Sequence, residues 1–110
     1  MRMLPRNAQA DLFLDDTHVG VVTVQGQRNN WTFARFEANE AFGQFAILFG
    51  QWLMLMHEDG HITRAASDEL RRTEHAIDAL RARLRVHKTG EWCPLGEINI
   101  DGAMVEWKEL

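Results

Sequence analysis

Short runs of β-branched and apolar residues recur along the first third of the chain. Such runs occupy residues 12–14, 19–25 and 31–37, and polar segments at residues 15–18 and 26–30 separate them. Runs of this kind are typical of strands, and short polar segments are typical of turns. Residues 31–37 carry aromatic side chains on both faces, which predicts that both faces are at least partly covered. The pattern therefore predicts three strands in succession, of which the first two form a hairpin.

The middle of the chain changes to a helical period between Phe42 and Met56. One apolar stripe has spacings of three and four residues, and we expect it to lie in the core: Phe42, Phe45, Phe49, Trp52 and Met56. A second stripe makes the helix apolar on most sides: Ile47, Leu48, Met54 and Leu55. Such a helix has to be covered on most sides. Asn39 is placed to cap its N-terminus, and Asp59-Gly60 is typical of the turn that ends it.

A second helix is predicted to follow, with Thr63 as its N-cap and a charged outer face. Its apolar residues form a single stripe: Ile62, Ala66, Leu70, Ile77, Leu80 and Leu84. The end of this helix overlaps the next element, because from Arg83 the period returns to two. That change predicts a fourth strand over residues 83–87 and a loop over residues 90–94.

The clearest turn in the chain is Asp101-Gly102, which lies between two alternating runs. An Asp-Gly pair in this setting is a strong signal for a type I′ hairpin. The hairpin would pair Ile98 with Val105 and would set Glu97 opposite Glu106. These runs predict the fifth and sixth strands.

The predicted order of elements is β-β-β-α-α-β-β-β. Short connections favour antiparallel neighbours, and consecutive helices pack together on one side of such a sheet. The sequence thus predicts one domain over residues 1–110 of the α+β class. We expect a mainly antiparallel sheet of about six strands with two helices packed on one face.

Composition narrows the classes of partner and compartment. The formal net charge of −4 argues against nucleic acid, because phosphate binding needs an electropositive face. The one cysteine, Cys93, cannot form an internal disulfide, which favours a reducing cytoplasm, and no neighbouring base activates it as a nucleophile. Residues 1–10 lack the apolar core of a signal peptide. The central apolar run is short and interrupted by Gln44, Gly50 and Gln51, so we expect no membrane span.

Residues 57–61 spell H-E-x-x-H, a pattern in which two histidines bind zinc and a glutamate activates water. That chemistry needs His57 and His61 one turn apart on the same face of a helix. Here Gly60 falls where the hydrophobic pattern stops, so the histidines are expected to diverge at a helix end. We therefore interpret the segment as a helix C-cap with a solvated turn, and we expect no metal and no cofactor.

The remaining candidate residues suggest binding. A basic run suits an anion, an acidic partner or RNA: Arg81, Arg83, Arg85, His87 and Lys88. The alternative is a solvated face balanced by the aspartates of the N-terminal hairpin: Asp11, Asp15 and Asp16. Trp92, beside Pro94, is the tryptophan that we expect to be exposed, and exposed tryptophans often anchor partners. The interaction candidates are thus Trp92, Arg83, Arg85 and His87.

The third strand and the first helix resemble a pattern found in a family of small uncharacterised bacterial proteins. The pattern is a W-x-[FY]-[GA]-R-F-E strand that runs into a helix with paired phenylalanines. Here it is carried by Trp31 to Glu37, Ala41-Phe42, Phe45 and Leu48-Phe49. The resemblance implies a bacterial cytoplasmic protein and transfers no functional residues, since the family has no assigned activity.

These observations favour a non-catalytic protein-interaction or binding module. We expect a homodimer that buries apolar residues of the first helix or of an edge strand. A competing expectation is a monomer in which residues 1–10 fold over the open surface. Two other functions stay open: a small-ligand-binding protein with a cavity beside the first helix, and a zinc-dependent hydrolase through His57 and His61.

Overall fold

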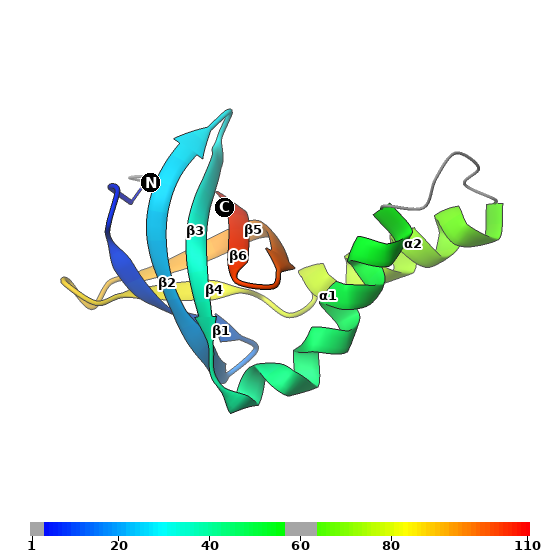
Figure 1. Cartoon of the computed structure of the whole chain (residues 1–110), viewed down its shortest axis with the longest axis horizontal. Coiled ribbons are helices and arrows are strands. Elements are labelled where there is room, and N and C mark those ends of the chain that lie inside the picture. The colour runs from blue at the N-terminus through cyan, green and yellow to red at the C-terminus, as the bar shows by residue number, and fades with distance from the viewer. Residues whose placement is uncertain (1–3, 57–63) are drawn as a thin grey trace.

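The computed structural model describes residues 4–56 and 64–110, and it belongs to the predicted α+β class (Figure 1). Within these ranges the chain forms six strands, two α-helices and one 3-10 helix. In chain order the elements are β1 (Gln9–Leu14), β2 (Thr17–Arg28), β3 (Trp31–Ala38), η1 (Glu40–Phe42), α1 (Gly43–Met56), α2 (Arg64–Asp78), β4 (Arg83–Val86), β5 (Trp92–Asp101) and β6 (Met104–Glu109).

The six strands are antiparallel, as predicted, and they close into a barrel. Their order is β1-β2-β3-β6-β5-β4, and the pairing of β1 with β4 completes the ring. Alternate side chains point inward, so the barrel has its own core, in which Leu12, Val22 and Trp107 are fully buried. Each described strand has a neighbour on both sides, so no described strand offers a free edge at which a second copy could pair.

The two helices form a hairpin that projects from one side of the barrel (Figure 1). The ring of Phe42 links the two parts, because it lies 5.1 Å from the ring of Phe36 in β3 and 6.1 Å from that of Phe49 in α1. Near the end of α2, the amide of Asp15 donates to the carbonyl of Leu80 at 2.6 Å. No helix in the described ranges combines the length and apolar character needed to cross a membrane.

The apolar stripe that we expected in the core is only partly buried. Phe49 is 1% exposed, whereas Phe42, Phe45 and Trp52 are half-buried against the core. Met56, at the far end of the stripe, is 50% exposed, so the prediction is wrong at that residue. The reason is geometric: the hairpin extends beyond the barrel wall that would have to cover it.

Asn39 precedes the helical segment as predicted, but its side chain does not cap it. Its Nδ2 group donates instead to the carbonyl of His18 at 2.9 Å, and its backbone amide donates to the carbonyl of Val19 at 2.9 Å. Asn39 therefore ties the start of η1 to β2. The predicted cap of the second helix, Thr63, and the turn at Asp59-Gly60 lie outside the described residues.

The last hairpin has a different register from the predicted one. Asp101 pairs with Met104 and Ile98 with Trp107, so Glu97 faces Lys108 and not Glu106. A type I′ turn centred on Asp101-Gly102 would need positive φ at both residues. Around this turn Gly102 alone has a positive φ, of 58°, which suits the first central position of a type II′ turn over Gly102-Ala103.

Candidate interaction surfaces

The segment around Trp92, predicted as a loop, is the beginning of β5. Cys93 and Leu95 are buried, and Trp92 and Pro94 are exposed, so the segment alternates like the other strands. The prediction failed because a proline argues against a central strand. In the register of β4 and β5, Arg85 is opposite Trp92 and Arg83 is opposite Pro94. The barrel thereby places three of the four interaction candidates on one outer surface.

We call this surface the Trp92 face, and it consists of Phe13, Arg83, Arg85 and Trp92. The guanidinium of Arg83 lies over the rings of Trp92 and Phe13, 4.8 Å and 5.5 Å from their centroids. The guanidinium of Arg85 also lies over the Trp92 ring, at 5.5 Å. The rings of Phe13 and Trp92 are 5.0 Å apart, and Trp92 is 45% exposed. Stacking engages the flat face of a guanidinium and leaves the N–H groups at its edges for an anion.

The two arginines differ in their ionic partners. Arg83 Nη2 lies 3.4 Å from Asp16 Oδ1, but the Asp16 side chain is 90% exposed, and such surface pairs contribute little. Among the described residues, no ion pair involves Arg85. The N-terminal aspartates therefore neutralise only part of the positive charge that the basic run places on this face.

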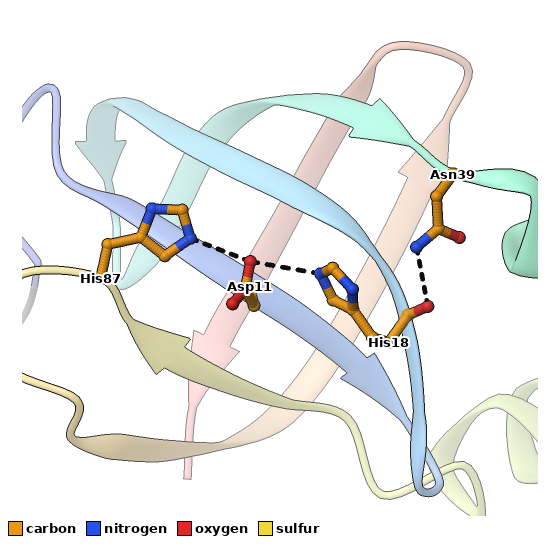
Figure 2. Close-up of polar contacts among 4 residues, drawn as sticks. All are labelled: Asp11, His18, Asn39 and His87. Atoms are coloured by element: carbon orange, nitrogen blue, oxygen red, sulfur yellow. Dashed lines mark hydrogen bonds and ion pairs between the residues drawn. The ribbon is translucent and has the colours of Figure 1, made fainter.

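The fourth candidate, His87, contacts a carboxylate instead of Trp92 (Figure 2). Asp11 Oδ1 lies between two histidines, 2.9 Å from His87 Nε2 and 3.2 Å from His18 Nε2. Burial raises the pKa of Asp11, but the hydrogen bonds and charges of the two histidines outweigh it and hold this pKa below its usual 3.8. The carboxylate of Asp11 is thus already engaged and does not pair with Arg85.

Metal binding finds no support in the described part of the chain. Among residues 4–56 and 64–110, no three His, Cys, Asp or Glu side chains gather in a way that would hold an ion. His57 and His61, the residues of the zinc motif, lie outside the described residues. Cys93 is buried beneath the Trp92 face. Burial raises the pKa of its thiol, and Glu109 and Glu91 raise that pKa further, so the thiol is a poor nucleophile.

A cleft of about 960 Å³ adjoins the Trp92 face. It lies between residues 4–9 of the N-terminal segment and the connection from β4 to β5, and Trp92 is part of its lining. Arg6 and Lys88 give this lining positive charge, and Glu91 is its one acidic residue in the described chain. The cleft therefore extends the basic character of the Trp92 face toward the N-terminus.

A second candidate surface lies on the outer side of α1. Ile47 is 72% exposed and Met54 is 74% exposed, and the two residues are two helical turns apart. Gly50 lies between them, and a Cβ atom there would meet no other atom within 4 Å. None of the fourteen residues of α1 carries a charge. We call Ile47, Gly50 and Met54 the α1 outer face.

On another side of α1, a groove of about 370 Å³ separates the helix from the barrel. Its apolar lining comes from both parts of the molecule: Phe33, Trp52, Leu53, Met56 and Met104. The small-ligand alternative predicts an enclosed cavity beside the first helix, and this groove is half open to solvent. The groove is therefore the structural counterpart of that alternative, in a shallower form.

Comparisons of the chain with known proteins do not assign it to a family. Neither a protein-family model, nor a curated protein, nor a solved structure matches the chain. Sequence reasoning found Arg83 and Arg85 from the local basic run, and Trp92 from its position beside Pro94. It missed Phe13, which joins them only because β1 pairs with β4 and sets Phe13 opposite Arg83. No local signal in the sequence predicts the pairing of β1 with β4.

Proposed function

We propose that the protein is a non-catalytic protein-interaction module that associates with a second copy of itself through the α1 outer face. The observation that carries the proposal is the exposure of Ile47 and Met54, at 72% and 74%, on a helix without charged residues. The barrel completes its core without these side chains. Gln51, which is also exposed, lies on the same side of the helix, so the patch is uncharged but not wholly apolar. Exposed apolar patches mark sites of association.

A second copy suits this surface better than a lipid surface does. A two-fold interface places one patch against the same patch, and an uncharged patch meets no like charge there. Anionic lipids attract helices that are flanked by lysine and arginine. No lysine or arginine occurs between Arg35 and Arg64, and acidic residues flank the helix in sequence at Glu40 and at Glu58-Asp59. The charge pattern therefore favours self-association.

The expected dimer is weak. Complete burial of an Ile or Met side chain contributes about 1.5–3 kcal/mol, and an isologous dimer buries two copies of Ile47 and of Met54. The loss of translational and rotational freedom opposes association by about 4 kcal/mol or more. Gly50 favours the contact because its missing side chain lets a second helix approach closely. We expect a dissociation constant of tens of micromolar, to order of magnitude.

The groove beside α1 supports binding of a small apolar molecule as a second candidate function. Its volume of about 370 Å³ falls within the range of known ligand pockets. Such pockets normally enclose most of their ligand, however, and this groove is half open. We therefore place ligand binding second to protein interaction.

Light scattering across a dilution series tests the dimer. We expect the wild-type mass to rise from 12.7 kDa toward twice that value as concentration increases through tens of micromolar. Ile47→Glu should remain at 12.7 kDa, because a two-fold contact would bury two carboxylates. Leu110→Glu is the matched control, since Leu110 is 78% exposed and lies outside α1, and it should behave as wild type. A wild-type mass of 12.7 kDa throughout would contradict the proposal.

A further inference from the structure

We infer that the Trp92 face binds an acidic peptide segment of a partner protein. This surface lies on the barrel wall, and its use does not depend on self-association through α1. The shared chemistry is a carboxylate held by a stacked arginine. Four observations support it. The guanidinium groups of Arg83 and Arg85 lie over an aromatic ring, and neither arginine has a strong ion pair in the described chain. These guanidinium groups cover the Trp92 ring against a stacking base, and a cleft adjoins the surface.

The two arginines are oriented to receive carboxylates. The central carbon of each guanidinium lies over the Trp92 ring, at 4.8 Å for Arg83 and 5.5 Å for Arg85, so cation–π contact with the ring restrains its position. A guanidinium held in this way loses little further freedom when it forms two parallel hydrogen bonds to a carboxylate. Arg83 and Arg85 occupy alternate positions of the same strand and so point to the same side of the sheet.

The positive charge on this face is not neutralised internally. Arg85 has no ion pair among the described residues, and Arg83 has one at 3.4 Å with a largely exposed aspartate. Asp11 is opposite Arg85 in the register of β1 and β4. Its carboxylate is engaged by His18 and His87. An incoming carboxylate can therefore pair with these arginines without breaking a strong existing ion pair.

An acidic peptide fits this face better than a nucleic acid does. Single-stranded nucleic acids bind to exposed aromatic rings by stacking their bases on the ring faces. Both arginines lie over the Trp92 ring, so a base would have to displace a guanidinium. A net charge of −4 also repels a polyphosphate strongly, since its charge continues along the whole strand. A short acidic segment carries fewer charges and can confine them to the two arginines.

The adjoining cleft gives an extended peptide room to continue. Trp92 forms part of its lining, which among the described residues also contains two basic residues, Arg6 and Lys88, and one acidic residue, Glu91. Its volume of about 960 Å³ is far larger than one side chain requires. The exposed indole and the ring of Phe13 supply apolar contact next to the charges. We therefore expect a segment with acidic residues and an apolar residue between them to bind best.

Fluorescence anisotropy with a short labelled peptide, in which two glutamates flank one leucine, tests the inference. The protein is used as the full chain in the Ile47→Glu background, so that self-association does not enter the result. We expect salt-sensitive binding that weakens about tenfold in Arg85→Gln and in Trp92→Leu, because each removes a charge-assisted contact or its support. Arg71→Gln, which removes an exposed arginine from α2, is the matched control and should bind as the parent does.

Two further arms make the outcome decisive. Arg85→Lys keeps the charge but not the planar fork, so its affinity should lie between those of the parent and of Arg85→Gln. Unchanged denaturation midpoints will show that the variants are folded. The inference is wrong if the peptide with two glutamates does not bind at millimolar concentration, or if Arg85→Gln and Arg71→Gln behave alike. It is also wrong if decauridylate RNA binds more tightly and loses affinity with the same substitutions.

Discussion

The barrel and the helical hairpin are both rich in apolar residues, and they bury them very differently. In the barrel, Leu12 and Trp107 are 0% exposed, because alternate side chains point into a closed ring. In α1, Phe49 is the one buried residue, and Ile47 and Met54 are more than two-thirds exposed at 72% and 74%. The barrel core therefore takes only a few side chains from the helices, such as Phe49 and Ile77, and α1 carries further apolar surface that the fold does not use.

The difference shows what a hydrophobic period can and cannot establish. A period of two or of 3.6 identifies the side chains that share a face. It does not identify what covers that face. For a strand in a closed barrel the cover is always the opposite wall, so the period alone is sufficient. For a projecting hairpin the cover can be a second molecule, and we propose that this is the case here.

The largest expected effect is a difference in the free energy of unfolding between substitutions at two residues of the same helix. Phe49→Ala should lower the free energy of unfolding by about 3–5 kcal/mol, because it opens a cavity in the core. Ile47→Ala should change it by less than about 0.5 kcal/mol, because that side chain is 72% exposed. Urea denaturation of dilute protein measures both values. Equal effects would mean that α1 is oriented differently on the barrel.

The next largest effect is on stability when one glycine of the barrel and one glycine of α1 are each replaced by alanine. Gly20 in β2 has a φ of 157°, and a Cβ atom there would clash with the carbonyl oxygen of Glu37 and the ring of Phe36. Gly20→Ala should therefore destabilise the fold by about 3 kcal/mol. Gly50→Ala should stabilise it by about 0.5–1 kcal/mol, because the site is open and alanine favours helix. Thermal unfolding in the monomer range checks both signs, and a tolerated Gly20→Ala would refute the close packing of β2 on β3.

The smallest effect tests the polar cluster on the barrel wall. The lowered pKa of Asp11 implies a stabilising contribution that is present above its usual 3.8 and is lost as the pH falls through its lower folded value. Asp11→Asn should therefore lose less stability on acidification than wild type, by about 0.5 kcal/mol or less. Asp16→Asn, at a 90% exposed side chain, is the control. Parallel acid-denaturation curves for wild type and Asp11→Asn would contradict the contacts drawn in Figure 2.

Most of the strands and both helices could be predicted because their signals are local. Runs of β-branched and apolar residues identified residues 12–14, 19–25 and 31–37, which lie in β1, β2 and β3 respectively. Closure of the barrel could not be predicted, because it depends on pairing Asp11 with Arg85, which are 74 residues apart in the chain. No short-range pattern encodes such a contact.

The candidate surfaces were predictable to different degrees. Trp92 and the arginines stood out by residue type, but the stacking of Arg83 on Phe13 depends on the same long-range closure. The excess of apolar residues on α1 was evident from the sequence. Which of them are exposed was not, because that depends on how far the hairpin extends beyond the barrel wall.

Hydrogen–deuterium exchange at two protein concentrations tests the central claim most directly. Association stabilises the segment that it covers and so slows its local opening. As concentration rises through the micromolar range, exchange should slow in peptides from Gly43–Met56 and stay constant in β1 and β6. In Ile47→Glu the α1 peptides should exchange at one rate at both concentrations. Concentration-independent exchange of wild-type α1, or slowing confined to the barrel, would contradict the account.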